Sequence, residues 1–100
     1  MEALSIKTLA EFKKALALPS IRVQGLAHPR CDHMRPEFKA DYFAPRQVAR
    51  LQTNAFTLKP IASVNESWMY FQSAKHWVFD GSDVVRAVDG LSYRIFQVAD

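Results

Sequence analysis

The sequence predicts an α+β domain in which one N-terminal helix packs on a twisted antiparallel sheet of five or six strands. Three observations support this class: one amphipathic helical segment near the start, several runs with apolar residues at alternate positions, and two Asp-Gly pairs between strand-like runs near the end. The chain has 100 residues, of which 49% are hydrophobic and 23% charged. We therefore expect a single domain, residues 1–100, with one modest core.

The composition excludes several classes of protein. Three glycines and five prolines are too few for a collagen-like or low-complexity chain. No stretch approaches the ~18 apolar residues of a transmembrane helix, and no charged-then-apolar leader precedes a cleavage site. Cys31 is the single cysteine, so no intrachain disulfide can form, as is typical of a reducing compartment. We expect a soluble cytoplasmic protein.

Residues 8–18 are predicted to form the helix. Thr8 and Glu11 have the spacing of a capping box, in which each side chain accepts a hydrogen bond from the backbone N–H of the other residue. Pro19 prevents continuation of the helix. Because about three turns are not stable alone, the apolar stripe needs a surface to pack on. The stripe consists of Leu9, Phe12, Ala15 and Leu16.

The middle of the chain is predicted to contain two strand regions and a long loop. Period-two alternation over residues 21–24 predicts a strand, and Gly25 indicates a bulge or the end of that strand. Residues 28–45 hold three prolines and no sustained period, so a loop is expected there. Residues 47–59 are predicted to be one long strand with a bulge near Asn54.

A turn at residues 60–66 would then return the chain as an antiparallel strand over residues 67–71. The last quarter is predicted to be a three-stranded meander with two-residue turns at Asp80-Gly81 and Asp89-Gly90. Counting outward from these turns gives one strongly apolar face of the meander. We expect the N-terminal helix to pack on this face, with Arg86 at the rim of the face. This face would consist of Trp77, Phe79, Val84, Val88, Leu91, Tyr93 and Ile95.

The charge of the chain, +3 in total, is unevenly distributed. Residues 7–59 contain ten basic and four acidic side chains, whereas residues 60–100 contain three basic and five acidic ones. Around the predicted loop, basic residues interleave with aromatic ones. Guanidinium groups can pair with phosphates and rings can stack on bases, so this pattern suits single-stranded nucleic acid, and it suits an acidic protein surface equally well. The candidate binding residues are Arg30, Arg35, Lys39, Tyr42, Phe43, Arg46 and Arg50.

The same pattern also has a purely structural interpretation, in which the rings fix the loop to the sheet and the cations keep it soluble. A second cluster contains His28, Cys31 and His33, which are residue types that bind zinc or that form a thiol–imidazole pair. The spacing is unlike that of paired metal-binding hooks, and no oxyanion hole is evident. We therefore predict no metal, no cofactor and no enzymatic activity, with a small metal-binding protein or Cys/His enzyme as an alternative.

Four short stretches form a recognisable set: the helix-forming Lys7–Lys13, the stretch Pro45–Phe56, Ser67-Trp68 and Ser73-Ala74-Lys75. Together they resemble small uncharacterised proteins of bacteriophages, plasmids and other mobile genetic elements. Accessory proteins of such elements often bind and inhibit host defence machinery, anti-CRISPR proteins among them. The resemblance implies a non-enzymatic inhibitor in a bacterial host cell, which occludes a surface of a defence protein or ribonucleoprotein complex. Single-stranded nucleic-acid binding is the alternative function.

Overall fold

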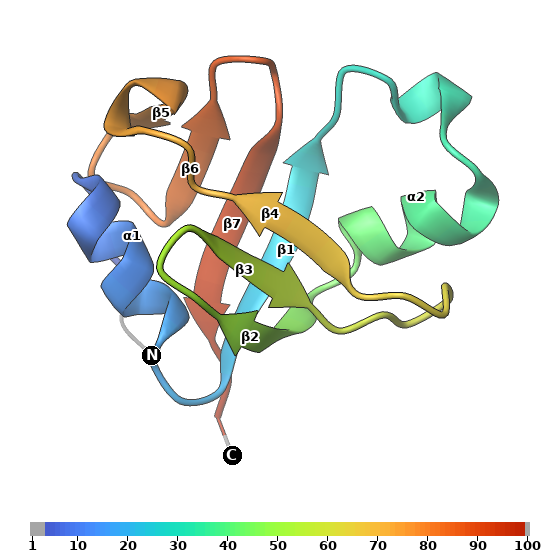
Figure 1. The fold of residues 1–100 in the computed structure, drawn as a ribbon, viewed down its shortest axis with the longest axis horizontal. Coiled ribbons are helices and arrows are strands. Elements are labelled where there is room, and N and C mark those ends of the chain that lie inside the picture. The colour runs from blue at the N-terminus through green and yellow to red at the C-terminus, as the bar shows by residue number, and fades with distance from the viewer. Residues whose placement is uncertain (1–3, 100) are drawn as a thin grey trace.

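The computed structural model describes residues 4–99 and shows a curled antiparallel sheet with two α-helices (Figure 1). The elements are α1 (Leu9–Leu16), β1 (Ile21–Ala27), α2 (Pro36–Phe43), β2 (Arg46–Leu51), β3 (Ala55–Leu58), β4 (Ser67–Tyr70), β5 (Trp77–Phe79), β6 (Val84–Ala87) and β7 (Ser92–Gln97). The strand order is β4-β3-β2-β1-β7-β6-β5. The predicted α+β class and antiparallel sheet are confirmed. The described residues form seven strands rather than five or six, and two α-helices rather than one.

The sheet curls so strongly that β3 and β4 lie in front of β1 and β7, with the core between them (Figure 1). The Tyr93 hydroxyl of β7 is 3.8 Å from the sulfur of Met69 in β4, which joins the two layers. Residues 71–76 connect β4 to β5, the two edge strands of the sheet. Trp77 Nε1 donates a 2.7 Å hydrogen bond to the Phe71 carbonyl and holds this connection in place.

Helix α1 closes one side of the curled sheet. The Thr8 hydroxyl accepts from the Glu11 N–H at 3.1 Å, as predicted, but the Glu11 carboxylate accepts from the N–H of Lys7 rather than Thr8. Phe12 is fully buried, and its ring centroid lies 5.1–6.0 Å from four other aromatic rings. These rings belong to Phe56, Phe71, Trp77 and Phe79. The predicted apolar stripe is therefore core, and the helix ends at Leu16.

The long loop predicted over residues 28–45 is wrong, because helix α2 occupies its second half. Pro36 is the first residue of this helix, a position where the missing N–H costs nothing because it would have no partner inside the helix. Only Asp41 and Tyr42 of α2 are buried. Within residues 4–99, no helix is long and apolar enough to cross a membrane.

The single strand predicted over residues 47–59 is also wrong, because the chain reverses there to form the β2–β3 hairpin. The turn is closed by a 2.8 Å hydrogen bond from the Gln52 N–H to the Ala55 carbonyl. The irregularity expected near Asn54 is thus a turn, and the register shift lies instead between Val48 and Arg50. Strand β4 returns antiparallel to β3, as predicted for residues 67–71.

The C-terminal meander forms, but the predicted register of its middle strand is wrong, by three residues against β5 and by one residue against β7. Counting outward from two-residue turns pairs Phe79 with Ser82 and Tyr93 with Arg86, whereas both residues pair with Val85 in the structure. Both connections are longer than two residues, although Gly81 and Gly90 have the expected positive φ angles of 84° and 102°.

A shift by an odd number of residues exchanges the two faces of a strand. Val85 and Ala87 therefore face the core, whereas Arg86 lies outside and forms a 3.1 Å ion pair with Asp80. Trp77 and Ile95 are buried, as predicted.

Candidate functional site

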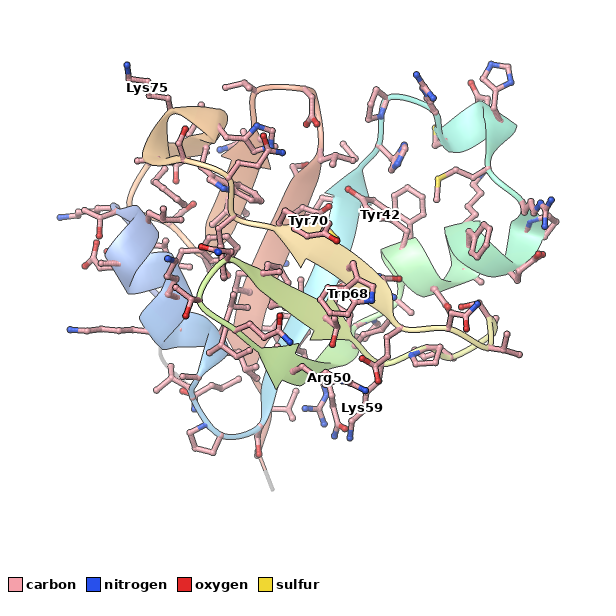
Figure 2. All side chains as sticks on the ribbon, viewed as in Figure 1. Tyr42, Arg50, Lys59, Trp68, Tyr70 and Lys75 are labelled. Carbon is pink, nitrogen blue, oxygen red and sulfur yellow. The ribbon has the colours of Figure 1, made fainter. Side chains whose placement is uncertain are left out.

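A groove of about 340 Å³ opens between the edge strand β4 and helix α2. Its apolar and aromatic lining is made by Met34, Phe38, Tyr42, Trp68, Met69, Tyr70, Trp77, Leu91 and Tyr93. Polar side chains also line it: His28, Arg46, Ser67, Gln72, His76 and Asp89. In Figure 2, Tyr70 on β4 and Tyr42 on α2 stand on opposite sides of this opening. A groove of this size and lining holds a small group or a few side chains of a partner.

Tyr42 forms a rigid wall of the groove. Its hydroxyl lies 2.5 Å from the carbonyl oxygen of Ala27 and 3.2 Å from that of Ser92, which ties α2 to both β1 and β7. Gly25 lets α2 approach β1, because a Cβ at that position would collide with the ring and the carbonyl oxygen of Tyr42. Burial raises the pKa of the Tyr42 hydroxyl, so it remains a protonated hydrogen-bond donor.

Asp41 anchors the other side of α2. Its buried carboxylate accepts hydrogen bonds from the N–H groups of Ile61, Ala62 and Ser63, and from the Ser63 hydroxyl. Burial alone would raise the pKa of this carboxyl, but the four hydrogen bonds outweigh that effect and lower its pKa to about 2. The negative charge of Asp41 is therefore satisfied by the loop after β3.

Arg46 is the second buried charge, and it is not satisfied in the same way. As the first residue of β2 it pairs with Val23 of β1, and its side chain points into the curled sheet, 4% exposed. Nη1 donates a 2.7 Å hydrogen bond to the Ser67 hydroxyl, and Nε is buried with no partner. Burial lowers the pKa of Arg46, against the attraction of Asp41, but a guanidinium keeps its proton at neutral pH.

Within residues 4–99, no carboxylate lies within 4.0 Å of the Arg46 guanidinium; the ion pairs are Arg50–Glu66, Arg86–Asp80 and Arg94–Asp83. Buried arginines normally have such a partner, because the desolvation of an unpaired charge costs several kcal/mol. Arg46 therefore supplies unsatisfied donor capacity at the base of the groove.

The predicted binding residues do not form one surface. Arg30, Arg35 and Lys39 are exposed on the segment that carries α2, whereas Arg50 is exposed on the outer face of β2. Phe43 is half-buried, with its ring centroid 4.9 Å from that of Tyr42. Two of the predicted residues, Tyr42 and Arg46, meet in the groove.

Sequence reasoning missed the contribution of β4. Trp68 and Tyr70 are 47% and 59% exposed on the outer face of this strand, and their rings stack with centroids 6.2 Å apart. The signal in the sequence was the pair of large aromatic residues at alternate positions of this strand, which lie on the same face. In Figure 2, Arg50 and Lys59 project below Trp68, at the end of the view away from Tyr70. Both are already engaged, Arg50 with Glu66 at 3.3 Å and Lys59 with the Gln47 side chain at 2.8 Å.

His28 and Cys31, from the predicted histidine and cysteine cluster, each contact a residue nearby in the sequence. His28 Nδ1 accepts a 3.0 Å hydrogen bond from the Arg30 N–H, and its ring contacts Tyr42 at 5.0 Å between centroids. Cys31 Sγ is 3.7 Å from a carboxylate oxygen of Asp32. Across the part of the chain that the structure describes, no three His, Cys, Asp or Glu side chains gather as metal ligands do.

A search of protein-family models, curated proteins and solved structures finds no match for this chain. What the groove can bind is therefore inferred from the hydrogen-bond donors of Arg46 and from the side chains that line it. A planar cation at its base pairs with a carboxylate or another anion, and its walls of rings and thioethers bury apolar groups.

Proposed function

We propose that the protein is a non-enzymatic binding protein that holds an acidic segment of a partner protein in the groove between β4 and α2. The observation that carries this proposal is the buried Arg46 guanidinium, which has one hydrogen bond, an unpartnered Nε and no carboxylate within reach. A carboxylate from outside the chain would supply the missing partner. A charge-assisted hydrogen bond of this kind stabilises a complex by about 1.5–3 kcal/mol.

The surroundings of Arg46 favour a polypeptide ligand. Met34, Phe38 and Leu91 offer apolar contacts to neighbouring side chains of the partner. Arg35 and Lys39, exposed on the α2 segment, add positive charge that attracts an acidic protein. Asp89 also lines the groove and disfavours a densely anionic ligand there, so one carboxylate among apolar groups fits better than a run of phosphates.

The resemblance to proteins of mobile genetic elements supplies a biological setting for this activity. In that setting the partner is a component of a bacterial defence complex, and the binding protein inhibits it by occluding the acidic segment. This mode of action uses the Arg46 groove together with the exposed cations Arg30, Arg35 and Lys39.

The experiment selects ligands without assuming their sequence. A display library of random peptides is presented once with free C-termini and once with both ends fused, and is selected against the wild type, Arg46→Met and Arg94→Met. Arg94 is the matched control, an exposed arginine on β7 paired with Asp83. We expect peptides with one Asp or Glu among apolar residues, or apolar peptides with a free C-terminal carboxylate, whose affinity falls about 10- to 100-fold in Arg46→Met only.

The proposal fails if no peptide is enriched, or if the enriched peptides bind Arg46→Met as well as they bind the wild type. The two library arms show whether the carboxylate belongs to a side chain or to a chain terminus. Equal losses in Arg46→Met and Arg94→Met would indicate a non-specific effect of net charge and would also contradict it.

A second candidate function is single-stranded nucleic-acid binding, which the stacked and exposed pair Trp68–Tyr70 favours. Bases stack on such rings at about 1–3 kcal/mol each. Because Trp68 is exposed and Trp77 is buried, quenching by a ligand on this surface acts mainly on the fluorescence of Trp68. Quenching by an oligothymidylate, abolished in Trp68→Phe and weakened steeply by salt, would support this candidate. The absence of quenching at low salt would remove it.

A further inference from the structure

Resting on the proposed function, we infer that the acidic segment binds as an added strand along the free edge of β4, paired with the backbone of Trp68 and Tyr70 and with its carboxylate against Arg46. Three independent features lead to this: the direction of the backbone groups of β4, the position of those groups on the wall of the groove, and the unsatisfied guanidinium at its base.

The direction of the backbone groups follows from the register. In an antiparallel pair, hydrogen-bonded and non-bonded residue pairs alternate. The Phe71 N–H donates to the Asn54 carbonyl at 3.0 Å, so this pair is hydrogen-bonded. Tyr70, opposite Ala55, is then in a non-bonded pair, and Trp68, opposite Thr57, is in the next one. The N–H and C=O groups of Trp68 and Tyr70 therefore point away from β3.

The other side of β3 gives the same alternation. The Lys59 N–H donates to the Gln47 carbonyl at 3.0 Å, and the Gln52 N–H donates to the Ala55 carbonyl at 2.8 Å. These bonds direct the backbone N–H and C=O groups of Ala55 toward β2, so they do not bond to Tyr70, the residue opposite in β4. Outside the strand ladders, none of the backbone hydrogen bonds among residues 4–99 involves residues 67–70.

The free edge of β4 borders the groove. Residues 67–70 all line it, although the rings of Trp68 and Tyr70 stand on the outer face of the sheet. An extended peptide beside β4 would lie about 4.8 Å from it, over the space bounded by Met34 and Phe38. Alternate side chains of that peptide would point inward to Arg46, whose Nη1 is already bonded to Ser67 of the same strand.

An extended polypeptide fits this edge better than a nucleic acid does. The free groups of β4 alternate donor and acceptor with the spacing of a peptide backbone, which is the pairing used in β-augmentation. A phosphodiester chain offers acceptors but no matching donors. The walls of the groove are apolar, and Asp89 lines it as well, whereas a nucleic-acid groove is lined by cations.

The first test measures amide hydrogen exchange by NMR, with a peptide selected as described above. In the free protein we expect rapid exchange at the N–H groups of Trp68 and Tyr70 and protection at those of Met69 and Phe71. The bound peptide should slow exchange at Trp68 and Tyr70 by at least about 10-fold. If the peptide binds and these two amides stay unprotected, strand addition is wrong while the proposed function stands.

The second test compares two substitutions at one position. Tyr70→Val removes the ring and keeps the N–H, whereas Tyr70→Pro removes both, and proline is tolerated at an edge position whose N–H is not in the ladder. We expect the affinity for the selected peptide to change less than about 3-fold in Tyr70→Val and to fall at least about 10-fold in Tyr70→Pro. Thermal unfolding of both variants verifies that each is folded.

The remaining outcomes are also decisive. Equal losses in Tyr70→Val and Tyr70→Pro would show that the ring makes the contact, which contradicts strand addition. Protection of Trp68 and Tyr70 that rises with protein concentration, without added peptide, would mean that a second copy of the chain occupies the edge and would overturn the inference. If Tyr70→Pro does not fold, N-methylation of alternate peptide residues replaces it, and full affinity in every N-methylated peptide would contradict the pairing.

Discussion

The two α-helices are equally long, eight residues each, but they cover the sheet in opposite ways. Helix α1 inserts Phe12 among four rings and leaves that side of the core closed. Helix α2 buries one tyrosine and one carboxylate, and leaves a groove beside them with Arg46 at its base. The first arrangement satisfies every group it buries, whereas the second leaves a charge partly unsatisfied.

This difference separates the part of the molecule that stabilises the fold from the part that can bind. Apolar burial at α1 needs no partner from outside. Asp41 of α2 and Arg46 of β2 are both buried, but only Asp41 has a complete set of hydrogen bonds within the chain. Substitutions on the two sides should therefore affect stability very differently.

The largest effect is expected at α1. Phe12→Ala should lower the free energy of unfolding by about 3–5 kcal/mol, because it leaves a cavity at the centre of the aromatic cluster. Urea denaturation followed by circular dichroism measures this loss. Phe38→Ala, on α2 and 48% exposed, is the matched control and should cost less than about 1 kcal/mol. Similar losses at both positions would contradict the contrast between the helices.

The next largest effect is expected at Asp41. Asp41→Ala should cost about 2–4 kcal/mol, since it removes the acceptor of three backbone N–H groups and one hydroxyl. A loss below about 0.5 kcal/mol in urea denaturation would show that water replaces the carboxylate without penalty.

Asp41 also predicts a pH dependence. Its folded-state pKa is about 2, below the ordinary value of 3.8, so protons bind the unfolded state more readily between these values. Its contribution to stability is therefore complete above about pH 4 and is lost as the pH falls through about 2. The difference in unfolding free energy between the wild type and Asp41→Asn should shrink over this range. A difference independent of pH would contradict the assigned hydrogen bonds.

A smaller effect is expected where α2 approaches the sheet. Gly25→Ala places a methyl group against the ring and backbone of Tyr42 and should cost about 1–3 kcal/mol by overpacking. The Tyr42 hydroxyl would also be displaced from the Ala27 carbonyl. Gly25→Ala should recover part of its lost stability when combined with Tyr42→Ala, which removes the ring but leaves the carbonyl oxygen in place. A double-mutant cycle with no coupling would mean that the ring takes no part in the clash.

The sequence predicts those features that depend on neighbours in the chain. The cap at Thr8 and the burial of Phe12, Trp77 and Ile95 follow from local spacing and alternation, and all are confirmed. The predicted register of β6 is wrong because the turn before this strand is held by a contact with a residue far away in the sequence. The Ile6 backbone exchanges two 3.0 Å hydrogen bonds with Gly81 and Ser82, and nothing in the local sequence indicates them.

The groove could be predicted only in part. Tyr42 and Arg46 are among the candidate residues, but the three prolines and the lack of a sustained period over residues 28–45 predict a loop around Tyr42, where the structure has the helix that begins at Pro36. Whether an arginine at the start of a strand points inward depends on its pairing with the neighbouring strand, here Val23 of β1. That pairing joins segments far apart in the sequence, so alternation within β2 alone could not reveal it.

The central claim is that Arg46 serves binding and not folding, and the free energy of unfolding of Arg46→Met tests it most directly. Methionine has a similar length and needs no partner in an apolar site, so urea denaturation should give a stability within about 1 kcal/mol of the wild type, or higher. A loss of about 3 kcal/mol or more would mean that the guanidinium is satisfied inside the fold, and the groove would then have no unmet charge for a partner to complete.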